Sequence, residues 1–148
     1  MQKNSFTINA NKTDNFIKKY LNQQKKTFLI YPMKYGVLSG GKKIRSSVII
    51  NTGKMFNLNT SKLIAVCAAV ECIHSYSLIH DDLPCMDNDK LRRGKPSAHI
   101  KFGESTAVLA GNSLLTLAFE IIADKKYKID NKSKIELIKS LALCSGHS

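Results

Sequence analysis

Residues 62–84 read KLIAVCAAVECIHSYSLIHDDLP, and this stretch decides the fold. The run is mostly apolar and too long for a strand, so it predicts a helix over residues 62–80. Small alanine side chains in its first half would let a neighbouring helix approach closely. Pro84 should bend or end the helix, because a proline disfavours helical geometry at the residue before it.

Apolar residues recur at helical spacing on both sides of this stretch. The N-terminal stripe, for which Thr13 or Asp14 is the expected N-cap, consists of Phe16, Ile17, Tyr20, Leu21, Gln24 and Phe28. A second helix is expected from Ile44 to about Gly53. An amphipathic helix is expected over residues 131–143, with one apolar face formed by Ile135, Ile138, Leu141 and Ala142.

Residues 104–123 are apolar almost all round, so they predict a helix that is buried on every side. Residues 36–41, 57–61 and 94–103 read as loops or turns, and Tyr31-Pro32 interrupts the first stripe. No convincing strand alternation is present. A chain of 148 residues fits a single domain, and the pattern predicts an all-α bundle.

The strongly basic composition raises the possibility of a nucleic-acid partner, since the net charge is +12. Only three of the basic residues are arginines (Arg45, Arg92 and Arg93), and the lysines are scattered along the chain. Abundant lysine, asparagine and isoleucine are typical of an AT-rich genome. Aromatic residues are not interleaved with the lysines, as a base-stacking surface would require, so no nucleic-acid binding is expected.

The four cysteines form no CxxC pair and no dense disulfide framework, which favours free thiols in a reducing compartment. A zinc site from Cys72, His74, His80 and Cys85 would match no common ligand spacing. The polar N-terminus has no apolar signal core, and no apolar run reaches the roughly 18 residues of a membrane span. A cytoplasmic protein is therefore expected.

Three carboxylates follow the long helix, at Asp81, Asp82 and Asp87, and two guanidiniums come soon after, at Arg92 and Arg93. Carboxylate oxygens suit Mg²⁺, which keeps coordination positions for substrate phosphates. Arginine pairs bidentately with phosphate oxygens, so the cluster predicts a site that grips a diphosphate. A solvated acidic loop is the alternative. A calcium-binding loop that starts at Asp87 is disfavoured, because Leu91 and Arg92 occupy the positions that require a ligand and a glycine.

Helical geometry places His74, Ser77 and Asp81 on one face of the long helix, whereas His80 and Asp82 point elsewhere. His80 and Asp82 are therefore expected to have supporting or packing roles. Asp87 would not align with Asp81 on an unbroken helix. A local bulge at Pro84 could bring these two carboxylates together around a metal ion.

A second motif, SGGKKIR, occupies residues 39–45. Its glycines let backbone N–H groups approach an anion, and the helix that follows favours negative charge at its start. Lys42 and Arg45 are three residues apart and share one side of the first turn. A solvated basic loop is the alternative. A nucleotide-binding P-loop is disfavoured, because Lys43 stands where Ser or Thr must bind Mg²⁺.

Taken together, these motifs resemble the trans-isoprenyl diphosphate synthases, in particular the short-chain bacterial branch. The segments that carry the resemblance are GGKKIR (40–45), AVECIHSYSLIHDDLP (69–84), Met86-Asp87, LRRGKP (91–96) and the run from His99 to Gly111. The aspartate-rich motif with two extra residues, Pro84 and Cys85, is its most specific part. The resemblance extends over nearly all of the chain from about Tyr31 and implies the isoprenoid-synthase helical bundle.

The resemblance implies a role for each motif residue. Asp81 and Asp87 would ligate Mg²⁺ that bridges an allylic diphosphate, with Asp82 as a third catalytic carboxylate that supports them. Arg92 would contact the allylic diphosphate. The residues implied to bind isopentenyl diphosphate are Lys42, Arg45, His74 and Arg93. Tyr76 and Ser77 would line the growing prenyl chain and set its length.

The implied enzyme is a Mg²⁺-dependent prenyltransferase. It condenses isopentenyl diphosphate head-to-tail with dimethylallyl or geranyl diphosphate to make farnesyl diphosphate, and intact members of the family are expected to be homodimers. Metal ions and basic residues stabilise the departing diphosphate, and the isopentenyl double bond attacks the allylic cation.

The chain departs from the family in one respect, because family members are roughly twice as long and carry a second aspartate-rich motif. The only acidic residues after Glu104 are Glu120, Asp124, Asp130 and Glu136, and no two are adjacent. Residues 1–148 are therefore expected to be the N-terminal portion of one polyprenyl synthase domain, without its C-terminal half. The alternative function is a truncated, non-catalytic remnant or a partner subunit of such an enzyme.

Overall fold

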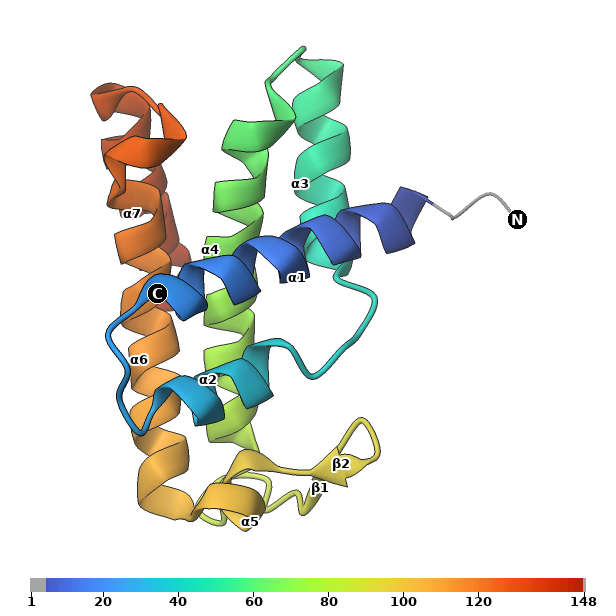
Figure 1. The fold of residues 1–148 in the computed structure, drawn as a ribbon, viewed down its shortest axis with the longest axis vertical. Helices are drawn as coiled ribbons and strands as arrows, with labels where there is room; N and C mark the ends of the chain where they lie inside the picture. Colours follow the sequence, from blue (N-terminus) through green and yellow to red (C-terminus); the bar gives the residue numbers. More distant parts are fainter. Residues whose placement is uncertain (1–4, 148) are drawn as a thin grey trace.

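The computed structural model describes residues 5–147, and within them the predicted all-α architecture is confirmed (Figure 1). The helices are α1 (Ser5–Gln23), α2 (Ile30–Val37), α3 (Ile44–Met55), α4 (Thr60–Asp81), α5 (Ala98–Phe102), α6 (Glu104–Ala123) and α7 (Asn131–Ser145). A 3-10 turn, η1 (Lys125–Tyr127), precedes α7. Two short strands, β1 (Leu91–Arg92) and β2 (Lys95–Pro96), form an antiparallel hairpin between α4 and α5.

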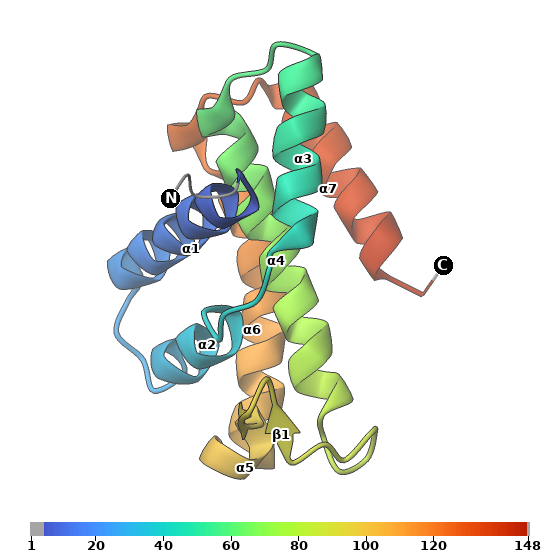
Figure 2. The same ribbon diagram turned by 90° about the vertical axis from the view of Figure 1, so that its right-hand side faces the viewer.

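The long helices α4 and α6 lie side by side along the long axis and form the centre of the bundle (Figures 1 and 2). Helices α1 and α2 cross them on one side, and α3 packs beside the N-terminal part of α4. Helix α7 lies on the opposite side from α1 and α2 in Figure 2. The hairpin and α5 lie at the end of the bundle where α4 finishes (Figure 1).

The predicted close approach to residues 62–80 is confirmed, because α4 presents small side chains to its neighbours. Ala65, Ala68 and Ala69 are fully buried, and large side chains of α6 such as Leu114 and Ile121 are fully buried in the same core. Large residues on one helix fill the space that alanine leaves on the other. Burial of each side chain of that size stabilises the fold by roughly 1.5–3 kcal/mol.

Both ends of α4 follow from local sequence. Asn59 is the N-cap, and its side-chain oxygen accepts a hydrogen bond from the Ser61 N–H at 2.8 Å, as expected of a turn over residues 57–61. The helix ends at Asp81, three residues before Pro84, so the predicted termination is confirmed.

The predicted start of the first helix is wrong. Helix α1 already includes Ser5, and Thr13 lies buried within it instead of capping it. The Thr13 hydroxyl donates to the Asn9 carbonyl oxygen at 3.0 Å, which satisfies the side chain inside the helix. Gln24 and Phe28, assigned to the same stripe, lie beyond the end of α1.

The predicted loops at 36–41 and 94–103 are each partly wrong. Gly36 belongs to α2 and not to a loop. It lets α2 pack closely against Ile79 of α4, because a Cβ at this position would lie 2.5 Å from Ile79 Cδ1. Residues 94–103 contain β2 and the short helix α5. Two-residue strands are too short to show an alternating pattern, which is why the sequence does not reveal the hairpin.

Burial of residues 104–123 on every side is also contradicted. Leu109 is 44% exposed, and Asn112 and Thr116 are exposed on the same helix. On α7, Ile135 is 64% exposed and Ala142 is also exposed, so only Ile138 and Leu141 of the predicted apolar face pack against the core. Helices α6 and α7 therefore each have apolar residues exposed at the surface of the described chain.

Helices α4 and α6 are long and apolar enough, by length and composition alone, to cross a membrane. In the bundle, 56% of the most apolar window of α4 and 44% of that of α6 are buried. Core helices of soluble proteins pass the same test, so these two helices are weak evidence for a span.

Gly36→Ala should lower the free energy of unfolding by about 1–2 kcal/mol, because overpacking against Ile79 outweighs the roughly 1 kcal/mol gain in helix propensity. Urea unfolding followed by circular dichroism measures the change. Asn51→Ala, at an exposed position of α3, is the control and should leave stability within about 0.5 kcal/mol of wild type. Equal stability of Gly36→Ala and wild type would show that Ile79 can move aside.

Candidate functional site

The aspartates after α4 lie in a compact turn. The backbone N–H of Asp87 donates to the carbonyl oxygen of Asp81 at 2.8 Å, and the N–H groups of Met86 and Asn88 both donate to the Leu83 carbonyl oxygen. The chain therefore folds back, and Asp87 returns to the last residue of α4. The backbones of Asp81 and Asp87 are therefore adjacent, whereas the meeting of their carboxylates around a metal ion stays a prediction. Asp81 is half-buried and Asp87 is exposed.

Asp82 differs from the other two aspartates because it is buried and ion-paired. Arg92 Nε lies 2.8 and 2.9 Å from the two carboxylate oxygens, and Arg92 Nη2 makes a further short contact with Oδ1. Asp82 is 2% exposed, and this hydrogen bonding raises the pKa of Arg92. The pair thus holds β1 against the end of α4, while the Arg92 side chain stays 31% exposed to solvent.

Arg93 joins the two motifs, because its guanidinium reaches the glycine loop that precedes α3. Nη1 donates to the carbonyl oxygen of Gly40 and lies 3.3 Å from the Ser39 hydroxyl. Gly41 has φ 111°, and a Cβ on it would lie 2.7 Å from Arg93 Nη1. Glycine is therefore required at position 41 for its backbone and for this contact.

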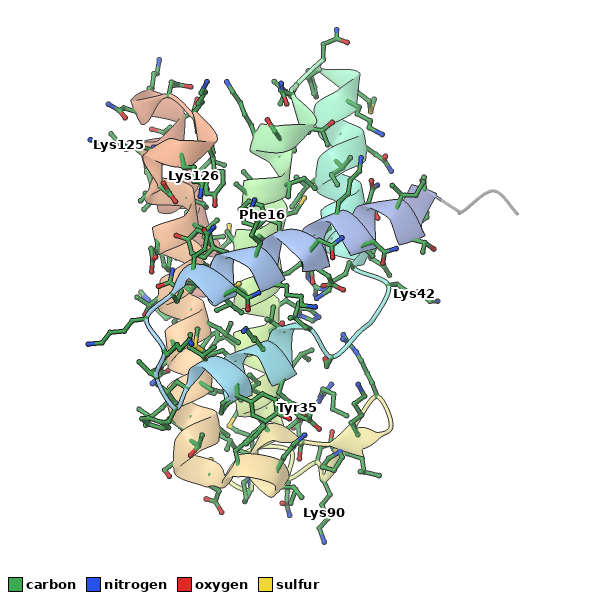
Figure 3. All side chains as sticks on the ribbon, in the orientation of Figure 1. Phe16, Tyr35, Lys42, Lys90, Lys125 and Lys126 are labelled. Atoms are coloured by element: carbon green, nitrogen blue, oxygen red, sulfur yellow. The ribbon has the colours of Figure 1, made fainter. Side chains whose placement is uncertain are left out.

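The three basic residues of the glycine loop point in different directions. Lys42 extends into solvent away from the bundle (Figure 3), and Arg45 is exposed on the first turn of α3. Lys43, which the sequence analysis assigned no role, is buried beneath them, with an ion pair to Glu71 at 3.7 Å. One signal was available in the sequence: Glu71 is a lone acid in an apolar run, and a buried acid needs a partner.

His74 lies between α3, α4 and α7 in a cavity of about 400 Å³, whose lining also includes Arg45, Tyr76, Ser77 and Leu141. Burial lowers the pKa of His74, and the positive charge of Arg45 lowers it further. Glu71 opposes this effect, while Arg93 and Lys43 add to it. Positive charges of three residues, from the glycine motif and the hairpin, thus act on one imidazole, which is an environment that favours a bound anion.

Tyr76 and Ser77 border the same cavity, although their polar groups have other partners. The Ser77 hydroxyl donates to the His74 carbonyl oxygen at 3.0 Å, within the helix. The Tyr76 ring packs edge-on against His80, with ring centroids 4.7 Å apart. His80 Nε2 lies 3.2 Å from the Val108 carbonyl oxygen of α6, so His80 has the packing role expected from its helical face.

The donor set at the aspartate turn is compatible with Mg²⁺ but not with a closed protein cage. Within residues 5–147, no group of three or more His, Cys, Asp or Glu side chains is arranged to hold a metal ion. Asp82 is occupied by Arg92, which leaves Asp81 and Asp87. Two carboxylates fit Mg²⁺, because this ion takes one or two from the protein and completes its shell with water and substrate phosphates.

Comparisons with known proteins agree with this fold. The family model described as polyprenyl synthetase matches residues 26–146. Farnesyl diphosphate synthase of Escherichia coli is 51% identical over 121 residues, which are 81% of this chain and 40% of the relative. Farnesyl diphosphate synthase of Buchnera aphidicola from Acyrthosiphon pisum is 50% identical over 124 residues, 83% of this chain and 44% of the relative.

Solved structures give the same result. The crystal structure of an FPP/GFPP synthase from Zymomonas mobilis superposes with a TM-score of 0.91 at 41% identity, covering 96% of this chain and 52% of that chain. A geranyltransferase from Legionella pneumophila superposes with a TM-score of 0.91 at 33% identity, covering 96% and 50%. The fold thus matches about half of the length of each of these solved structures.

The chain belongs to the polyprenyl synthetase family. It spans about 40% of the length of the Escherichia coli relative and about half of the Zymomonas mobilis structure.

Asp82→Asn should lower the free energy of unfolding by about 3 kcal/mol, since breaking a buried pair leaves Arg92 without its main partner. Asp89→Asn is the matched control: Asp89 lies 3.6 Å from the same guanidinium but is 56% exposed, so its loss should cost about 0.5 kcal/mol or less. Chemical denaturation measures both variants. Similar losses for the two would show that the Asp82 pair does not anchor the hairpin.

His74 should titrate below 6.5, its ordinary pKa, in an NMR titration of the folded chain assigned with His74→Gln. The unfolded chain then binds more protons as the pH falls through about 6.5, so His74 lowers the free energy of unfolding on the acid side. His74→Gln should remove this part of the acid destabilisation. A His74 midpoint at or above 6.5 would contradict the cationic environment described for this cavity.

Proposed function

We propose that this chain is the N-terminal part of a single polyprenyl synthase domain that makes farnesyl diphosphate. The reaction joins isopentenyl diphosphate to dimethylallyl or geranyl diphosphate. The observation that carries the proposal is the contact of Arg93 with Ser39 and Gly40, which brings two motifs distant in sequence into one basic surface beside His74. Further support comes from the relatives, which bear the name farnesyl diphosphate synthase.

The basic surface is the proposed site for isopentenyl diphosphate. Lys42 and Arg45 are exposed on either side of buried Lys43, and Arg93 is held next to the same loop. Guanidinium groups bind phosphate oxygens in pairs, and an ammonium adds a point charge. Protonation of His74 would become favourable once a diphosphate offsets the surrounding positive charge, so the imidazole can add a donor to the bound ligand.

The aspartate turn is the proposed site for the allylic diphosphate. Asp81 and Asp87 would hold Mg²⁺, and Asp82 would support them by fixing Arg92 at the edge of the turn. When bound, Mg²⁺ would supply charge neutralisation for the departing diphosphate. Arg92, partly exposed, can add hydrogen bonds to the same leaving group.

Arg93 connects the glycine loop to the hairpin that follows the aspartate turn, so the two anion sites would hold their substrates in a fixed relative orientation. Loss of diphosphate from the allylic substrate leaves an allylic cation, and the isopentenyl double bond attacks it. A proton then leaves the product, with the released diphosphate as the acceptor. The growing chain would occupy the cavity that Tyr76 and Ser77 border, where the tyrosine ring limits its length.

A non-catalytic remnant or partner subunit is the second candidate. An open apolar cavity of about 720 Å³ between α3, α4 and α7 favours it, because side chains such as Val48, Phe56 and Leu137 line that cavity without a covering element in the described chain. The aspartate turn also offers only two carboxylates for metal. Turnover by this chain, alone or with a second polypeptide, would exclude the remnant.

A homodimer and a cytoplasmic location complete the proposal of a farnesyl diphosphate synthase.

Binding of a non-reactive geranyl thiolodiphosphate should tighten about tenfold when Mg²⁺ is added, because the ion joins the diphosphate to Asp81 and Asp87. Isothermal titration with Mg²⁺ and with a chelator measures the difference. Asp81→Ala should abolish the Mg²⁺ effect, whereas Glu136→Ala, at an exposed position of α7, should preserve it. Equal affinity in Mg²⁺ and chelator would refute the metal role.

Tyr76→Ala should lengthen the product beyond farnesyl diphosphate, because it removes a ring from the cavity next to α7. The assay uses residues 1–148 joined to the C-terminal half of the Escherichia coli relative, with product lengths read by chromatography. Thr116→Ala, on the outer face of α6, is the control and should leave product length unchanged. A farnesyl product from both variants would place chain-length control elsewhere.

A further inference from the structure

Lys43 occupies an unusual backbone position. Its φ of 45° and ψ of 50° lie in the left-handed region, which residues other than glycine adopt rarely. It follows Gly40 and Gly41, which also have positive φ, and it is the residue from which α3 starts. Its side chain is only 3% exposed, so this backbone geometry turns a lysine into the bundle while Lys42 and Arg45 remain outside.

The buried ammonium of Lys43 contacts three other helices. Nζ donates to the Val37 carbonyl oxygen at the end of α2, at 2.8 Å. It lies 3.4 Å from Asp14 Oδ1 of α1, a buried oxygen with no hydrogen bond among the described residues. It lies 3.7 Å from Glu71 Oε2 of α4. One charge thus ties the start of α3 to α1, α2 and α4.

Glu71 completes this arrangement from the other side. Its side chain is 2% exposed, and its Oε1 accepts a hydrogen bond from the Ser46 hydroxyl of α3 at 3.0 Å. Both carboxylate oxygens therefore hold the first turn of α3, one through Lys43 and one through Ser46. Glu71 also lies one helical turn before His74 on α4 and acts on it electrostatically.

A buried ion pair is a poor source of stability, because removing two charges from water offsets most of their attraction. Its better-attested effect is to select one arrangement of the groups around it. Here those groups are Lys42 and Arg45, which flank Lys43 in sequence, and the His74 imidazole, one helical turn after Glu71 on α4.

We infer that Lys43 and Glu71 are positioning residues for the diphosphate-binding loop. They touch no substrate; they fix Lys42 and Arg45 at the distance from His74 and Arg93 that a diphosphate requires. This inference rests on the proposed function, since it assigns the pair to the isopentenyl diphosphate site of that reaction.

The test variant is the double substitution Lys43→Met/Glu71→Gln. It removes one positive and one negative charge, so the net charge stays at +12 and long-range attraction for anions is unchanged. Replacing Glu71 together with Lys43 avoids leaving the Glu71 carboxylate buried and unpaired, and glutamine keeps an acceptor for Ser46. Asp14 also loses its contact with Lys43, but its side chain is 30% exposed and stays hydrated. The single variant Lys43→Met is measured beside it.

The probe is inorganic pyrophosphate, titrated without Mg²⁺ so that the aspartate turn does not contribute. Its dissociation constant is measured by calorimetry, and the response of the His74 imidazole is followed by NMR. The double variant should bind pyrophosphate about tenfold more weakly than wild type, because the loop cations are no longer fixed. The shift of the His74 resonances on binding should shrink in parallel.

Lys134→Met is the matched control. Lys134 is also a buried lysine, and its ammonium donates to a helix-terminal carbonyl oxygen, that of Ala123, at 3.1 Å. It lies on α7, outside the glycine loop. This variant should lose thermal stability and keep wild-type pyrophosphate affinity, which separates loss of fold from loss of positioning.

The outcomes separate the two proposals. Wild-type affinity in a folded double variant would overturn the positioning role and leave the proposed function standing. A tenfold loss in Lys134→Met as well would also overturn it, because the effect would then follow stability. If wild type itself fails to bind pyrophosphate, the proposed isopentenyl diphosphate site is wrong, and the positioning role fails with it. The inference is supported if pyrophosphate affinity falls in the double variant and in Lys43→Met but stays at the wild-type value in Lys134→Met.

Discussion

The close packing of α4 against α6 is the constraint on which the rest of the structure depends. Fully buried alanines on α4 let large side chains of α6 fill the core, which fixes the two axes relative to each other. This packing also fixes the position of the C-terminal end of α4 and of the aspartate turn that follows it. Helices α1, α2 and α3 then cover the remaining faces of α4, and the glycine loop between α2 and α3 is held beside the same helix.

Two buried ion pairs connect that core to the loops. Asp82 with Arg92 attaches the hairpin to the end of α4, and Lys43 with Glu71 attaches the glycine loop to its middle. In each motif one charged residue is buried, Asp82 in the aspartate turn and Lys43 in the glycine loop, while other charged residues of the same motif, such as Asp87 and Lys42, are exposed. Asp82 and Lys43 are both buried, and each one attaches the motif that contains it to the core. Loops that carry binding groups thus gain a defined shape without long secondary structure.

Much of this could be predicted from the sequence, because the patterns involved are local. The ends of α4 and the bounds of α6 follow from a capping asparagine, a proline and continuous hydrophobicity, and Pro84 explains how the backbone of Asp87 returns to Asp81. The helical face of Asp82 predicts a supporting or packing role, but its partner Arg92 and the burial of Lys43 could not be predicted, because they depend on which segments meet around each charge. The exposed sides of α6 and α7 were missed for a related reason: hydrophobicity indicates that a face is suited to burial but not whether a neighbour covers it.

Helix α7 is attached to the bundle differently from the others, since its only buried residue among those described is Lys134. The ammonium of that lysine donates to the carbonyl oxygen of Ala123, the last residue of α6, and apolar side chains of α7 are only partly buried. A helix with so few buried apolar contacts opens locally at a lower free energy than the core helices do. Its amide protons would therefore exchange with solvent through local opening, whereas those of α4 would wait for the whole bundle to unfold. Stability in this chain is graded from the centre outward, and the wall of the His74 cavity formed by α7 belongs to the least protected layer.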